Sequence, residues 1–159
     1  MLISLLVVLS AMQSSGPTIA PASGKTMCSA LTPADFTKAG VPVSRLREAN
    51  LDGNRSAYCI YDGKAEKIEF DIFYPAGDTP AEAQNAERAA QAAIGGSFES
   101  VHVAGADEAT TNAGSPKDTE ASIVVRKGTT VFNISIPRGA QVRQQLVALS
   151  EVVVNRLKQ

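Results

Sequence analysis

The chain has 159 residues, enough for one domain with a substantial hydrophobic core, and it has no tryptophan and few aromatic residues. Its 15 basic and 16 acidic side chains give a net charge of −1, with no block of like charges. Because nucleic acids and anionic membranes require a basic patch, and stacked bases or sugar rings require aromatic platforms, this composition disfavours all of them as partners.

The N-terminus begins with an apolar run of about 11 residues, which is too short to span a bilayer. The run is typical of a signal peptide, and residues 20–22 (Ala-Pro-Ala) supply the small-x-small pattern that signal peptidase recognises. We therefore expect residues 1–22 to be a signal peptide, residues 23–27 a flexible tether and residues 28–159 a single domain. A buried N-terminal strand or helix is the alternative interpretation of the run.

Cys28 and Cys59 are the only cysteines of the chain. In an exported protein two cysteines are more often paired than free, because the compartment is oxidising. We predict a disulfide between them, which stabilises the fold by about 3 to 4 kcal/mol in the chain-entropy model. Two buried free thiols are the alternative. The residues before Cys28 do not form a lipobox.

Two segments carry the signals of a helix start. Residues 32–35 (Thr-Pro-Ala-Asp) place a threonine at the N-cap, a proline at the first helical position and an acidic residue at the third. Gly40 and Pro42 then predict a short helix. Residues 79–82 (Thr-Pro-Ala-Glu) repeat the pattern, and the alanine-rich stretch after them predicts a longer helix that ends at Gly95.

Strands are predicted where apolar residues alternate with polar ones or form short runs. The clearest is Lys67 to Tyr74, in which one face is apolar and the other is charged. The other predicted strands are Tyr58 to Tyr61, Phe98 to Val103, and a hairpin of Ala121 to Arg126 with Val131 to Ile136 across Lys127-Gly128. Residues 43–56 and 104–119 are predicted to be irregular.

The last segment has apolar residues at spacings of three and four from Val142 to Leu157, which predicts an amphipathic helix. The element order is then α-β-β-α-β-β-β-α. This order predicts an α+β fold, with an antiparallel sheet of about five strands and helices packed on one face.

His102, Asp107 and Glu108 form the only weak candidate for a polar site. A single histidine rules out metal sites that need several, and no G-x-S-x-G motif presents a nucleophile to it. Adjacent carboxylates can act as acid and base or bind a hard cation, but solvated loop or capping residues are the simpler interpretation. We therefore predict no catalytic residue, no metal site and no cofactor.

Four segments resemble a family of small bacterial cell-envelope proteins of unknown function, best known as actinobacterial lipoproteins. They are residues 28–35, Cys59 with the hairpin after it, residues 105–109 and residues 124–128. The resemblance spans roughly residues 28 to 157. It implies a layout similar to extracellular sensor domains, in which a sheet and helices enclose a cleft, and hence a binding role.

These observations favour an exported, non-catalytic binding domain of the periplasm, cell envelope or extracellular space, without a transmembrane helix in the mature chain. The expected partner is an unknown small ligand or an envelope protein, held in a groove between the sheet and its helices or on an exposed sheet face. A structural or assembly protein acting through protein contacts is the first alternative. An enzyme that uses His102, Asp107 or Glu108 is the second.

Overall fold

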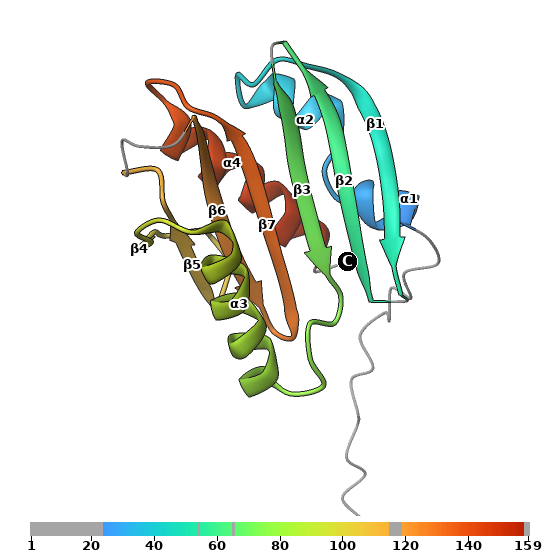
Figure 1. Ribbon diagram of the computed structural model, residues 1–159, viewed down its shortest axis with the longest axis vertical. Coiled ribbons are helices and arrows are strands. Elements are labelled where there is room, and N and C mark those ends of the chain that lie inside the picture. Colours follow the sequence, from blue (N-terminus) through green and yellow to red (C-terminus); the bar gives the residue numbers. More distant parts are fainter. Residues whose placement is uncertain (1–23, 54, 65, 115–118, 158–159) are drawn as a thin grey trace, which may run out of the picture.

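A computed structural model describes residues 24–53, 55–64, 66–114 and 119–157, so the predicted signal peptide lies outside the described residues. The fold is α+β, with one antiparallel sheet of seven strands (Figure 1). The helices are α1 (Gly24–Cys28), α2 (Pro33–Lys38), α3 (Pro80–Ile94) and α4 (Val142–Arg156). The strands are β1 (Val43–Asp52), β2 (Ser56–Gly63), β3 (Lys67–Phe73), β4 (Glu99–Ser100), β5 (Glu108–Thr111), β6 (Glu120–Lys127) and β7 (Thr130–Pro137).

The sheet is built from two meanders that meet at its centre. Its strand order is β1-β2-β3-β7-β6-β5-β4, so the chain runs inward from one edge, crosses through α3 to the other edge and runs inward again. The two halves join where β3 pairs with β7, with Asp71 opposite Asn133 and Glu69 opposite Ser135. Residues distant in sequence are therefore neighbours in the middle of the sheet.

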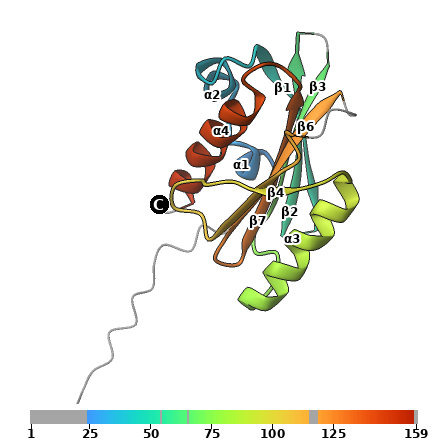
Figure 2. The same cartoon turned by 90° about the vertical axis from the view of Figure 1, so that its left-hand side faces the viewer.

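Helices cover both faces of the sheet, and not one face as the sequence predicts. Helices α1, α2 and α4 lie on one face, and α3 lies on the other (Figure 2). Helix α3 has its own apolar side, which packs on this second face of the sheet. Its sheet-facing side carries alanines and Ile94 together with the buried Glu87, and the fully buried Ala83 belongs with Val124 and Val131 to a second, smaller apolar cluster.

The predicted strand count was too low because β1 and β5 lack a regular apolar alternation. Strand β1 lies at the edge, most of its side chains are exposed, and its register to β2 shifts at two places. Such bulges disrupt the two-residue period on which sequence interpretation depends. Strand β5 is only four residues long and lies within the predicted loop 104–119, whereas the predicted strand 98–103 is reduced to the two residues of β4.

Both predicted helix starts are confirmed by reciprocal capping contacts. The backbone nitrogen of Thr79 donates to Glu82 Oε2 at 3.1 Å, and the backbone nitrogen of Glu82 donates to Thr79 Oγ1 at 3.3 Å. At α2 the backbone nitrogen of Thr32 donates to Asp35 Oδ2 at 2.7 Å. The predicted tether differs from the structure, because residues from Gly24 onward form α1 and the side chain of Met27 is buried.

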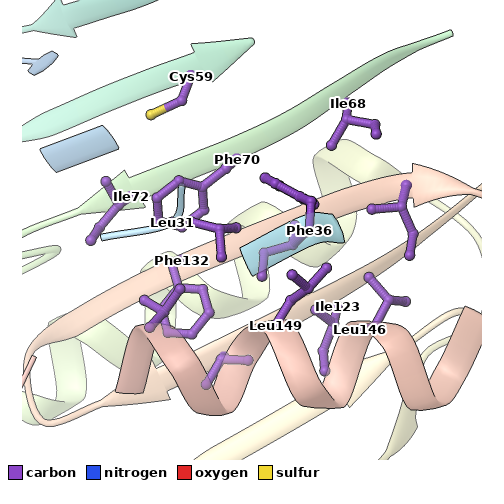
Figure 3. Packing of buried hydrophobic residues seen from close by; sticks show 14 of the residues in the cluster. Leu31, Phe36, Cys59, Ile68, Phe70, Ile72, Ile123, Phe132, Leu146 and Leu149 are labelled. Carbon is purple, nitrogen blue, oxygen red and sulfur yellow. The ribbon is translucent and has the colours of Figure 1, made fainter. Parts of the chain in front are cut away.

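The main core lies between the sheet and α1, α2 and α4. Leu146 and Leu149 of α4 and Phe36 of α2 point toward the sheet, where Phe70 and Phe132 meet them (Figure 3). The alternation along β3 separates the two faces, since Ile68, Phe70 and Ile72 enter this core. The intervening residues of β3 therefore point to the opposite face, where α3 lies.

The predicted disulfide is present and joins α1 to β2. Cys28 and Cys59 are bonded, their Cα atoms are 5.7 Å apart, and both side chains are buried. The hydroxyl of Tyr61, two residues along β2, donates to the carbonyl of Leu31 at 2.5 Å and also lies 3.1 Å from the carbonyl of Cys28. A covalent bond and a buried hydrogen bond thus fasten the same turn to the sheet. None of the described helices is long and apolar enough to cross a bilayer.

Candidate functional site

A groove opens on the α3 face of the sheet, where polar side chains of three strands come together beside the helix. Helix α3 packs against β6 and β7 and leaves the centre of the sheet uncovered beside it (Figure 1). The groove has a volume of about 360 Å³. We call it the acidic groove, and its lining residues are Glu69, Asp71, Phe73, Ala90, Ala93, Ile94, Glu120, Ser122, Asn133 and Ser135.

Strand pairing determines which of these side chains are neighbours. Asp71 on β3 is paired with Asn133 on β7, and Glu69 is paired with Ser135. Ser135 is in turn paired with Ser122 on β6. Directly paired residues project from the same face of a sheet, so these side chains form two polar rows across its centre.

The floor of the groove consists of buried polar groups. Ser122, Asn133 and Ser135 are each 6% exposed or less, and the hydroxyls of Ser122 and Ser135 are 2.7 Å apart and share a hydrogen bond. Serine and asparagine are uncommon at buried positions of central strands, where apolar side chains stabilise more. Their presence here indicates that this part of the sheet is adapted to polar contacts.

Asp71 is the most unusual group of the groove. Asn133 Nδ2 donates to Asp71 Oδ2 at 3.0 Å, whereas Asp71 Oδ1 is buried and has no hydrogen-bond partner among the described residues. Burial raises the pKa of Asp71 to about 6; the hydrogen bond from Asn133 opposes that rise, and the nearby charge of Glu69 adds to it. The ionised carboxylate is therefore held in an environment that does not compensate its charge.

The two other carboxylates of the groove differ in how they are compensated. Burial tends to raise the pKa of Glu69, but hydrogen bonds from Lys67 and Tyr58 outweigh it and lower the pKa below the usual value. The hydroxyl of Tyr58 lies 2.7 Å from Glu69 Oε1. The pKa of Glu120 is raised by burial and by the charges of Glu69 and Glu66. All three acids thus gather in one place, and among the described residues Lys67 forms an ion pair only with Glu69, although its charge also tends to lower the pKa of Asp71 and of Glu120.

One wall and one end of the groove are apolar. The wall is formed by three residues of α3, namely Ala90, Ala93 and Ile94. The end is formed by Phe73 of β3, whose side chain is large, apolar and 38% exposed. The small alanine side chains keep the helix from filling the space above the polar rows. The arrangement suits a ligand with one polar end and one apolar part.

The residues of the predicted weak site, His102, Asp107 and Glu108, do not line the acidic groove. Glu108 Oε2 lies 3.1 Å from Arg126 Nη2, and Asp107 Oδ2 accepts a hydrogen bond from the backbone nitrogen of Gly128 at 2.5 Å. The two carboxylates therefore support a structural ion pair and a turn. His102 is exposed beyond β4, and no hydrogen bond or ion pair in the described part of the chain joins it to either carboxylate.

Arg126 is the centre of that second cluster. Besides Glu108, its Nε donates at 3.1 Å to Oε2 of Glu87, which comes from α3 and is almost completely buried. Burial raises the pKa of Glu87, and the charge of Glu108 raises it further, although Arg126 opposes both effects. The ion pair joins α3 to β6 of the sheet.

A smaller pocket of about 160 Å³ lies on the opposite face beside α1, and it is a weaker candidate. Most of its lining is apolar. Its charged side chain, Arg156, already bonds the carbonyl of Ala30 and both oxygens of Asp35, and the hydroxyl of Ser29 donates to the carbonyl of Thr26. The charged group of this pocket and the hydroxyl of Ser29 are thus committed to the fold.

Sequence interpretation missed the acidic groove because it assigned the polar face of β3 to solvent. The sequence does contain a sign of the groove, in strands β6 and β7. Ser122, Asn133 and Ser135 interrupt otherwise apolar strands at positions that face one way, and once the hairpin is paired they lie beside the acids of β3. Among the described residues no group of histidine, cysteine and acidic side chains is arranged to hold a metal ion.

Comparisons with known proteins add no identity to this geometry. No protein-family model, no curated protein and no solved structure matches the chain. The resemblance to actinobacterial envelope proteins stays a prediction, and function has to be inferred from the groove itself.

Proposed function

We propose that this chain is a non-catalytic binding domain of an exported envelope or secreted protein, and that the acidic groove holds its ligand. The buried Cys28–Cys59 disulfide supports a location in an oxidising compartment, where such bonds persist. The groove supports binding, because it combines a concave shape, an apolar wall and a few convergent polar groups. No nucleophile paired with a base lies among its lining residues.

The unpartnered oxygen of Asp71 is the observation that carries this proposal. A buried acceptor without a donor costs about 1 to 3 kcal/mol, and more when it is charged. An apolar residue at this position would stabilise the sheet, as Val124 and Val131 do in the neighbouring cluster. Groups that cost stability in this way are characteristic of functional sites, where the missing donor comes from a ligand.

An assembly role through strand pairing has less support. The long edge strand β1 offers unpaired backbone groups, but it carries two register shifts to β2. It also carries the charged side chains of Arg45, Arg47 and Glu48. Bulges and charges on an edge are the features that prevent pairing with another chain.

A matched set of small probes tests the proposal. Benzylamine, benzyl alcohol and benzoate share one apolar ring and differ only in the charge of the polar group. Each is titrated to millimolar concentration into the ¹⁵N-labelled protein, and amide chemical shifts are recorded. At least one probe is expected to shift the amides of β3, β6, β7 and α3 that surround the groove.

Two leucine substitutions on α3 provide the control. Ala93→Leu fills the groove from its apolar wall, whereas Ala92 is exposed and does not line it, so Ala92→Leu adds the same side chain without filling it. Probe-induced shifts are expected to persist in the second variant and to disappear in the first. The proposal is wrong if no probe shifts the groove amides, or if Ala93→Leu leaves the shifts unchanged.

A further inference from the structure

We infer that the ligand of the acidic groove is an organic cation, with a protonated amine that carries N–H donors and a compact apolar body. This inference rests on the proposed function and specifies its ligand class. It is drawn from the charge, the hydrogen-bonding groups and the apolar surfaces of the groove.

The charge of the acidic groove favours a cationic ligand. The lining contains three acidic side chains, Glu69, Asp71 and Glu120, and no lysine or arginine. The nearest compensating cation is Lys67, which forms an ion pair with Glu69, and no ion pair within the described part of the chain joins the other two carboxylates to a cation. A bound anion would be repelled by these groups at short range, whereas a cation would relieve their mutual repulsion and their desolvation.

The hydrogen-bonding groups of the acidic groove favour a ligand that donates hydrogen bonds. The lining groups that remain free to contact a ligand are mostly hydrogen-bond acceptors. The amide of Asn133 already donates to Asp71, and the hydroxyls of Ser122 and Ser135 bond each other. Asp71 lines the groove, and its Oδ1 is buried and has no donor among the described residues. A primary ammonium group has three donors and no acceptor, so it matches a surface of carboxylate and hydroxyl oxygens.

The aromatic ring of Phe73 also favours a cationic ligand. Phe73 and Asp71 are two residues apart on β3, so both project from the same face at a separation of about 7 Å along the strand. An ammonium group between them would form a charge-assisted hydrogen bond with the carboxylate and a cation–π contact with the ring. The alanines of α3 would then cover the apolar body of the ligand.

Binding of such a cation must depend on pH, because protonation of Asp71 removes a negative charge that attracts it. The charged groups around Asp71 are Lys67 and Glu69 on its own strand and Glu120 on β6, with the hydroxyl of Tyr58 on β2. Strand β7 and α3 present only uncharged side chains to the groove. Since burial raises the pKa of Asp71 to about 6, affinity is expected to fall as the pH drops below 6.

The probe titrations decide the ligand class when they are compared with one another. Benzylamine is expected to bind at the groove at least about tenfold more tightly than benzyl alcohol, and benzoate is expected not to bind there. Asp71→Asn is expected to weaken benzylamine binding by about tenfold and to remove its dependence on pH between 5 and 7. Asp52→Asn changes an exposed aspartate of β1 outside the groove, and it should alter neither result.

The outcomes separate this inference from the proposed function. If benzoate or benzyl alcohol binds at the groove as tightly as benzylamine, the groove is a binding site but the inferred ligand class is wrong. Equal benzylamine affinity in Asp71→Asn and in the unmodified protein also overturns the inference. If none of the three probes shifts the groove amides, the proposed function fails as well.

Discussion

Asn133 and Asp71 lie opposite each other across the β3–β7 pair, and the amide of Asn133 satisfies only one oxygen of the Asp71 carboxylate. The second oxygen is buried, and no described residue donates a hydrogen bond to it. At the centre of the sheet, where most residues increase stability, the ionised form of this side chain reduces it.

Asp71→Asn should therefore stabilise the protein at high pH. The pKa of Asp71 is about 6 in the folded state and 3.8 in the unfolded reference, so above pH 6 the folded state bears the cost of a buried charge. That cost fades as the pH falls from 6 toward 4, because the folded state binds the proton first. We expect a gain of about 1 to 3 kcal/mol at pH 8 and almost none at pH 4, measured by urea unfolding.

Asp52→Asn is the control for that experiment, because Asp52 is exposed and does not line the groove. It should change the free energy of unfolding little at either pH. A loss of stability in Asp71→Asn at pH 8 would contradict the interpretation of Asp71 as an uncompensated charge.

Arg126→Met should destabilise the protein strongly, because it leaves the carboxylate of Glu87 buried and unpaired. The expected loss at pH 7 is about 2 to 4 kcal/mol, measured by chemical unfolding. The loss should shrink at lower pH, since the raised pKa of Glu87 lets it become neutral. The double variant with Glu87→Met should recover most of the stability, because no buried charge remains. A double variant no more stable than Arg126→Met would count against this explanation.

Arg156→Gln should weaken the attachment of α2 to α4. Arg156 donates from Nη1 to Asp35 Oδ2 at 2.6 Å and from Nη2 to Asp35 Oδ1 at 3.0 Å. We expect a loss of about 1 to 2 kcal/mol at pH 7, reduced by the partial exposure of the arginine. Burial tends to raise the pKa of Asp35, but hydrogen bonds from Arg156 and Thr32 lower it below 3.8. The difference from the unmodified protein should therefore persist down to about pH 4 and narrow at lower pH.

Arg143→Gln is the matched control, because Arg143 is on the same helix and pairs with Glu99 at the surface. Exposed pairs of this kind contribute about 0 to 1 kcal/mol. Equal losses of stability in the two arginine variants would show that the Arg156 contact is no stronger than an ordinary surface pair.

Reduction of the disulfide should loosen residues 28 to 56 more than the β6–β7 hairpin and α4. The bond closes a loop with a sequence separation of 31, which in the chain-entropy model is worth about 3 to 4 kcal/mol. Helices α1 and α2 and the edge strand β1 lie in or beside this loop, whereas the hairpin and α4 lie outside it. Hydrogen exchange with and without reductant measures the difference, and an equal loss of protection in both regions would refute it.

The sequence predicts elements well where one local signal suffices. The caps at Thr32 and Thr79, the alternation of β3 and the disulfide all depend on residues close in sequence or on a count of cysteines. The predicted sheet failed at β1, where two register shifts place the partly buried residues three positions apart and so remove the two-residue alternation. The side of the sheet that α3 covers also depends on the crossover between the two meanders, which no local pattern reveals.

The candidate site was less predictable than the fold because it is assembled from four separate elements. Asp71 appears in the sequence as an ordinary solvent-facing residue of an amphipathic strand. It becomes unusual only because β7 pairs beside it and α3 leaves the groove open. The adjacent pair Asp107 and Glu108, which attracted attention in the sequence, is neutralised by Arg126 from a strand that pairing brings beside it.

The Cys28–Cys59 bond also has a mechanical consequence. A pulling force applied at the N-terminal side of the chain reaches Cys28 and passes through the covalent bond directly into β2, which pairs with β3 inside the sheet. Residues 29–58, which include α2 and the whole of β1, lie outside this load path. The edge strand would otherwise be the first element peeled from the sheet, but under tension it stays slack while the hydrogen bonds of β2 carry the force.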